Sequence, residues 1–125
     1  MPSVLNVDTL VAANGTDPVT LTKQSATKAW INFNGQGTIA IQTSFNISSI
    51  SDVSTGQYQV DFASAMSDAN HCTTLAVSHS SSADEGADLS TSVYGTTNYR
   101  VNNREGGGTY RDPIRFCCDT NGDLA

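Results

Sequence analysis

Positive charge is scarce in this chain of 125 residues. Six lysine and arginine residues stand against twelve aspartate and glutamate residues, which gives a formal net charge of -6. Binding a nucleic-acid backbone requires a cationic surface that releases counterions, and docking on anionic lipid requires one as well. The charge balance therefore argues against nucleic acid and against a membrane surface as partners.

Long apolar segments are also missing. The opening Met1-Pro-Ser-Val-Leu-Asn-Val-Asp8 has neither the basic region nor the apolar run of a secretory signal. No other stretch approaches the ~20 apolar residues that would span a bilayer. We expect a protein made in a cytoplasm, without membrane insertion, which is compatible with later release by lysis.

Cysteine is too sparse for a disulfide framework. Cys72, Cys117 and Cys118 are an odd number and lack the spacing of metal ligands. Neighbouring residues of a strand point to opposite faces, so Cys117 and Cys118 do not share one metal. We expect three buried or half-buried thiols, and no metal or other cofactor.

Charged residues of both signs make up only 14% of the chain, below the roughly 25% usual in globular domains. Serine, threonine, asparagine, glutamine and glycine fill the difference, which is typical of β-proteins with many turns. Hardly any segment has apolar residues at helical spacing. At this length we expect one domain with a single core.

Apolar and polar residues alternate in several short segments, which predicts antiparallel strands with one buried face. The longest alternation covers residues 38–47, and a hairpin is expected over residues 49–62. Seven or eight such strands predict an all-β fold, an antiparallel β-sandwich that is jelly-roll-like. Trp30 is expected in the core or at an interface. The residues expected to be largely buried are Ile31, Phe33, Ile39, Ile41, Phe45, Val60 and Phe62.

The composition changes at Lys28, which divides the chain into an extended N-terminal arm, residues 1–27, and a sandwich domain, residues 28–125. The arm has one short strand-like pattern and two turn signals, Asn14-Gly15 and Asp17-Pro18. It has too little apolar area to fold alone. We therefore expect it to pack on its own domain, on a sister subunit or on another protein.

A family signature begins at the same point. The chain reads Lys28-Ala-Trp30, Asn32-Phe-Asn-Gly35, Gly37-Thr-Ile39, Ser44-Phe-Asn-Ile-Ser-Ser-Ile50, Gly56-Gln-Tyr-Gln-Val-Asp-Phe62 and Ala65-Met-Ser-Asp-Ala-Asn70. In this order, the blocks resemble the tail fibre or fibre-like virion proteins of tailed bacteriophages. Such proteins favour an apolar strand that runs directly into a final Gly-Asp. Here Cys118-Asp-Thr-Asn121 intervenes, so we expect the last strand to stop early.

The resemblance implies a homotrimeric virion protein that is displayed outside the particle and is not an enzyme. The leading hypothesis is a short tail fibre or receptor-adhesion protein, with residues 1–27 attached to other virion proteins. The alternative is a capsid decoration, or cement, protein that stabilises the phage head, which the brevity of the chain favours. A free lectin and a hydrolase built from Ser80, His79 and Asp84 are weaker alternatives, since a serine-rich chain offers such triplets by chance.

Recognition of a host cell-surface glycan or protein is expected at the loops of residues 78–90 and 103–111, where the resemblance fades. The candidate receptor-binding residues are Tyr94, Arg104, Tyr110 and Arg111. An amphipathic ring and a planar guanidinium both suit a sugar or protein epitope. The alternative role for the arginines is salt bridging to Glu105, to Asp112 or to the acidic loop.

One acidic motif near the end has the spacing of metal ligands. Asp119-Thr-Asn121-Gly-Asp123 resembles the opening of a calcium loop, but the later positions of such a loop are absent. We therefore expect a solvated, poorly ordered tail and no calcium site.

Overall fold

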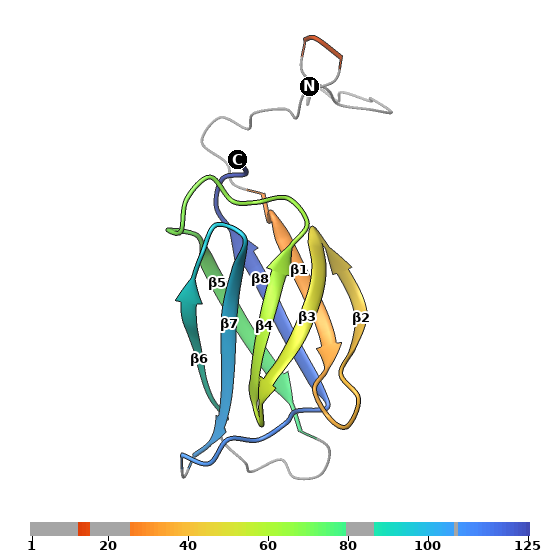
Figure 1. Ribbon diagram of the computed structural model, residues 1–125, viewed down its shortest axis with the longest axis vertical. Coiled ribbons are helices and arrows are strands. Elements are labelled where there is room, and N and C mark those ends of the chain that lie inside the picture. Colours follow the sequence, from red (N-terminus) through yellow and green to blue (C-terminus); the bar gives the residue numbers. More distant parts are fainter. Residues whose placement is uncertain (1–12, 16–25, 80–86, 107) are drawn as a thin grey trace, which may run out of the picture.

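The structure is a computed structural model that describes residues 13–15, 26–79, 87–106 and 108–125. Within these residues, eight strands form two four-stranded antiparallel sheets stacked on each other (Figure 1). Sheet A has the strand order β2-β1-β8-β5, and sheet B has the order β3-β4-β7-β6. The strands are β1 (Ala29–Asn34), β2 (Ala40–Phe45), β3 (Ile47–Ser54), β4 (Gln57–Phe62), β5 (Cys72–Ser78), β6 (Ala87–Tyr94), β7 (Asn98–Glu105) and β8 (Arg115–Asn121). No helix occurs in this part of the chain.

The predicted antiparallel β-sandwich is confirmed, and so is the predicted hairpin, which joins β3 to β4. The finer jelly-roll description stays a prediction. In the described residues the hairpins β1–β2, β3–β4 and β6–β7 each lie within one sheet, and the chain changes sheet after β2, β4, β5 and β7.

The core lies between the sheets and is rich in aromatic side chains. Phe33 and Phe116 of sheet A stack with ring centroids 5.4 Å apart, and Tyr58 of sheet B meets Phe33 edge-on at 5.0 Å. Each such pair stabilises by about 0.5–1.5 kcal/mol beyond its buried area. Of the predicted core residues, Ile39 packs half-buried against this cluster, and those fully within it are Ile31, Phe33, Val60 and Phe62.

Asn46 breaks the longest predicted strand in two, so the prediction of one continuous strand over residues 38–47 is wrong. The φ angle of Asn46 is 55°, in the left-handed region that asparagine tolerates better than most residues. Its Nδ2 donates to the carbonyls of Lys28 and Ser64, each at 3.1 Å, and its Oδ1 accepts from the N–H of Ser64 at 2.6 Å. The chain therefore leaves sheet A after β2 and enters sheet B at β3.

Two residues of the predicted core lie on the surface instead. Phe45 is 53% exposed and Ile41 is 38% exposed, so the prediction of burial is wrong for both. β2 is an edge strand, and its pairing with β1 contains a register shift. Phe45 lies opposite Trp30 and not opposite the buried Ile31, so it faces outward. Trp30 is itself 38% exposed, which excludes the core position considered for it.

The C-terminal residues are also part of the sandwich. β8 continues through Asn121 with Thr120 buried, and Leu124 forms a β-bridge with Met66. The predictions of an early end to the last strand and of a poorly ordered tail are therefore wrong. β8 is a central strand that pairs with β1 on one side and with β5 on the other, and these ladders outweigh the polar character of its sequence.

The three cysteines differ in exposure. Cys118 is buried in the core and Cys117 is half-buried, as expected, but Cys72 is exposed. The prediction fails for Cys72 because it begins the edge strand β5, whose alternate residues face solvent.

The sandwich has two ends, which we call the arm end and the far end. At the arm end, Lys28 leads into β1 and its N–H donates to the carbonyl of Thr120 at 2.9 Å. The far end holds the turn after β1 and residues 103–113. Residues 13–15 form the predicted turn, with a φ of 77° at Gly15. Residues 1–12 and 16–25 of the predicted arm lie outside the described residues, so the domain division stays a prediction.

Candidate functional site

Three of the four candidate receptor-binding residues lie together at the far end. Arg104, near the end of β7, forms an isolated β-bridge with Tyr110. Its guanidinium carbon lies 4.5 Å from the centre of the Tyr110 ring, and its Nη2 donates to the Tyr110 hydroxyl. This hydrogen bond is the main cause that raises the pKa of Arg104, so the guanidinium stays cationic. The pair thus presents a charged plane stacked on an aromatic ring.

Arg111 follows Tyr110 directly and is held by polar contacts of its side chain and its backbone. Its Nη1 lies 2.6 Å from Oε1 of Glu105, so the salt-bridge alternative is confirmed for this arginine. Its backbone N–H donates to the carbonyl of Asn103 at 3.2 Å, and its own carbonyl accepts from Asn103 Nδ2 at 2.6 Å. The ion pair is partly exposed and contributes about 1 kcal/mol at most. These two hydrogen bonds hold the Arg111 backbone in place, so they fix the position from which its side chain extends.

Asp112 connects this hairpin to the core. Its Oδ1 accepts from the N–H of Gly56 at 2.6 Å and from the hydroxyl of Tyr58 at 2.7 Å. Burial, reinforced by the hydrogen bond and charge of Asp112, raises the pKa of Tyr58, which therefore stays a neutral donor. The residues of the far end are thus anchored to β4, in the middle of sheet B, and not displayed on a free loop.

Tyr94 lies elsewhere. It pairs with Tyr99 at the arm end of sheet B, five residues of β7 away from Arg104. At a rise of roughly 3.3 Å per residue, this places it about 17 Å from the other three candidates. Its ring packs against the buried His71 at a centroid distance of 5.3 Å. The four candidates therefore do not form one site.

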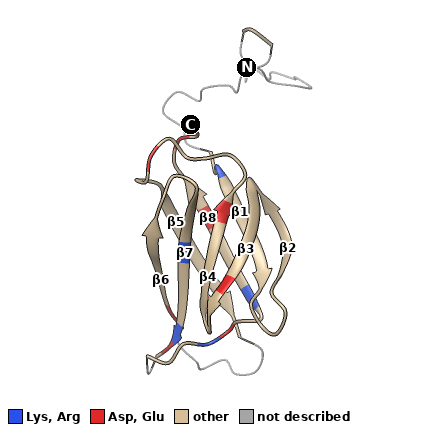
Figure 2. Cartoon of the chain, in the orientation of Figure 1, with Lys and Arg blue, Asp and Glu red and all other residues tan. Residues whose placement is uncertain are grey.

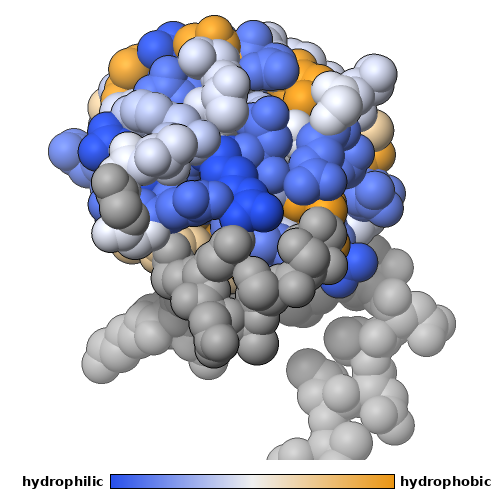
Figure 3. All heavy atoms as spheres, turned by 90° about the horizontal axis from the view of Figure 1, so that it is seen from below, coloured by the Kyte–Doolittle hydropathy of each residue, from blue (hydrophilic) through white to orange (hydrophobic). Residues whose placement is uncertain are grey.

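The far end has a mixed polar surface. Figure 2 shows charged residues of both signs gathered around the lower turn of the sandwich, whereas most strand surfaces carry few charges. Figure 3, which looks at this end, shows a mainly hydrophilic surface with scattered hydrophobic residues. Residues 80–86 and 107 of the two predicted recognition loops lie outside the described residues. The arginines and the tyrosine ring at the far end can donate hydrogen bonds to a polar ligand and stack on it.

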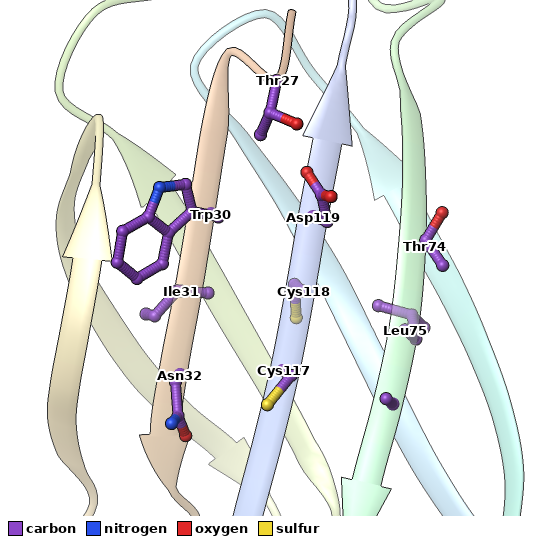
Figure 4. Close-up of a pocket in the computed structure, with 10 residues that line it drawn as sticks. Thr27, Trp30, Ile31, Asn32, Thr74, Leu75, Cys117, Cys118 and Asp119 are labelled. Carbon is purple, nitrogen blue, oxygen red and sulfur yellow. The ribbon is translucent and has the colours of Figure 1, made fainter.

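The outer face of sheet A holds a second candidate surface, which the sequence interpretation missed. A pocket of about 480 Å³ lies over β1, β8 and β5, with Trp30 and Thr74 on opposite sides and Cys117 between them (Figure 4). Of its ten lining residues only Asp119 carries a charge. The sequence did contain a signal for this surface, because Trp30 and Phe45 both lie in the blocks that resemble phage fibre proteins. The apolar alternation of residues 38–47, however, led to the prediction that Phe45 is in the core.

The sequence also raised the questions of a metal site, reactive thiols, a hydrolase triplet and a membrane span. Among the described residues, no three His, Cys, Asp or Glu side chains lie close enough together to hold a metal ion. Burial raises the pKa of the Cys118 thiol to about 12, so it is not a nucleophile at neutral pH. Ser80 and Asp84 of the hydrolase alternative lie outside the described residues. Within those same limits, no helix is long and apolar enough to cross a membrane.

Comparison with protein-family models, with curated proteins and with solved structures finds no match for this chain.

Proposed function

We propose that this chain is a non-enzymatic virion protein of a tailed bacteriophage: a short tail fibre or receptor-adhesion protein that assembles as a homotrimer. In this proposal residues 1–27 attach the trimer to other virion proteins. The far end of the sandwich then faces a glycan or protein of the host surface.

The observation that carries the proposal is the separation of the two ends. Lys28, where the arm joins, lies beside Thr120 at the start of β1, whereas Gly35, just after β1, bonds to the carbonyl of Pro113 at the far end. The six residues of β1 therefore separate the attachment point from the candidate contact group by about 20 Å. An adhesion protein needs this arrangement, because the part bound to the particle must leave the recognition surface free.

The contact group at the far end suits the proposed role. Arg104 and Tyr110 offer a stacked ring and guanidinium, and Arg111 adds a second planar donor beside them. Aromatic rings that stack on sugars and arginines that form paired hydrogen bonds are common elements of recognition surfaces. Tyr94, at the arm end, is outside this group, and its role in receptor binding is a separate prediction.

Immunogold electron microscopy of phage particles, with antibodies against the sandwich, tests the location. Gold at the tail supports the adhesion function. Gold spread over the capsid would instead support the decoration alternative, in which the far end is merely exposed.

Competition for adsorption tests the contact group. Purified protein should block adsorption of the phage to cells on which it forms plaques, and the double variant Arg104→Ala, Tyr110→Ala should lose this ability. Arg100→Ala is the matched control, because Arg100 lies on the same strand, four residues away from Arg104 and outside the group. Equal competition by all three proteins would contradict the proposed recognition surface.

A further inference from the structure

The outer face of sheet A carries an exposed pair of large aromatic side chains, Trp30 and Phe45. It also holds the pocket, whose lining combines Ala76 and Cys117 with the polar Asn32, Thr74 and Asp119. The outward positions of sheet B include Ser51, Gln59, Arg100 and Ser92, in register across its four strands, and the exposed apolar residues of its strands include the smaller Val53 and Val93. Exposed apolar surface of this kind marks an interaction site more often than a face left in water.

The edge of sheet A next to this face has a register shift against β1 but no charged residue and no proline. β2 reads Ala-Ile-Gln-Thr-Ser-Phe, without a charge or a proline, and Figure 2 shows it uncharged along its length. Five of its six residues are exposed, Ile41 and Phe45 among them. Soluble β-proteins usually place lysine, proline or other charged residues on exposed edge strands, because an unprotected edge recruits other chains. The sequence of β2 therefore leaves this edge open to contact with another chain.

Phe45 and the pocket form two unlike halves of one contact. Phe45 lies on β2 opposite Trp30 and is 53% exposed. The pocket extends from Trp30 across β8 to β5, away from β2 (Figure 4). A ring of three identical chains requires a head-to-tail interface, in which one surface of each copy meets a different surface of the next. The edge strand β2 with Phe45, and the pocket on the face of sheet A, are two different surfaces that meet this requirement.

We propose that the outer face of sheet A is the contact between neighbouring copies of this chain, with Phe45 and the edge strand β2 of one copy covering the pocket of the next. The proposal rests on the homotrimer of the proposed function and names the surface that forms it. Cys117, which lines the pocket, then lies in the interface. Cys72 does not line the pocket.

Cysteine cross-linking tests the contact directly. In a Cys72→Ser background, Phe45→Cys should form a disulfide with Cys117 of the neighbouring copy under copper–phenanthroline oxidation. A head-to-tail ring gives a covalent trimer on a non-reducing gel. Each copy then forms one disulfide through the cysteine at position 45 with one neighbour and a second through Cys117 with the other neighbour. The same protein with Cys117→Ser should give none. Val53→Cys, an exposed position on β3 of sheet B, is the control for random collision.

Protection of Cys117 tests the same contact with Phe45 intact. In Cys72→Ser protein, iodoacetamide should modify Cys117 roughly tenfold more slowly in the trimer than in Phe45→Ala protein diluted to monomer. A trimer by sedimentation that shows neither cross-link nor protection would overturn this contact and leave the trimer standing. A monomer at all concentrations would overturn the trimer, and this contact with it.

Discussion

Trp30 and Phe45 lie directly opposite each other on β1 and β2, and both side chains face away from the core. Their neighbours Ile31 and Ser44 form the next pair, in which Ile31 is buried. The signature that resembles phage fibre proteins therefore contributes a surface pair as well as core residues. An aromatic pair on a sheet face is stabilising in itself, but half of the Phe45 surface remains available to a partner.

Phe33→Ala and Phe45→Ala should differ sharply in their effect on stability. Phe33 is fully buried between Tyr58 and Phe116, so its truncation should lower the free energy of unfolding by about 3–5 kcal/mol. Phe45 leaves no cavity, and its truncation should cost about 1 kcal/mol or less in the isolated chain. Urea unfolding at several protein concentrations measures both. A concentration-independent loss of several kcal/mol for Phe45→Ala would contradict its surface position.

Replacing Asn46 should destabilise the crossing between the sheets. Asn46→Ala puts a less tolerant residue at a φ of 55° and removes three side-chain hydrogen bonds. The expected loss is about 2–3 kcal/mol, since the left-handed backbone costs roughly 1–2 and each partly exposed bond less than 1. Asn46→Gly is the matched control, because it restores the backbone freedom and loses only the bonds. Equal losses for the two variants in urea unfolding would show that the backbone conformation contributes nothing.

Local pattern predicted those parts of the fold that depend on neighbours in sequence. Tyr58, Val60 and Phe62 alternate with polar residues, and their strand faces the core as expected. Gly56, in the predicted turn, has a φ of 66°, and a Cβ there would lie 2.6 Å from the carbonyl oxygen of Asn103. Strand periodicity and turn glycines are therefore readable without knowing the fold.

Features set by distant contacts could not be predicted in this way. The outward orientation of Phe45 depends on the register with β1 and on the crossing at Asn46, neither of which the alternation of residues 38–47 encodes. The separation of Tyr94 from Arg104 and Tyr110 follows from the pairing of β6 with β7, in which Tyr94 lies opposite Tyr99. A one-residue change of register turns every side chain of a strand to its other face.

Asp112→Asn should loosen the far end through Tyr58 and Gly56. The variant keeps the shape of the side chain but replaces a charged acceptor of two short hydrogen bonds by a neutral one. Bonds to charged groups contribute about 1.5–3 kcal/mol each, so a loss of about 2 kcal/mol is expected. A double-mutant cycle with Tyr58→Phe, followed by urea unfolding, should show coupling of roughly 1 kcal/mol. Additive losses would mean that the two side chains do not act together.

Stability should fall at alkaline pH. Burial is the main cause that raises the pKa values of Cys118, to about 12, and of Tyr58 and Tyr99, whose ordinary values are 9.0 for the thiol and 10.0 for the phenols. A raised pKa means that the folded chain keeps protons which the unfolded chain loses. The stabilisation from these groups is therefore complete below about pH 9. It declines as the pH rises through the pKa values of the unfolded chain toward those of the folded chain. The slope is up to about 1.4 kcal/mol per pH unit for each buried group.

Urea unfolding in steps from about pH 8 to pH 11.5 measures this decline. Cys118→Ala should move its onset from about pH 9 toward about pH 10, because the remaining groups are phenols. Cys72→Ser is the control for the loss of a thiol, since that side chain is exposed and lies outside the core. A free energy of unfolding that stays level up to pH 11.5 would contradict the burial of these three groups in the native state.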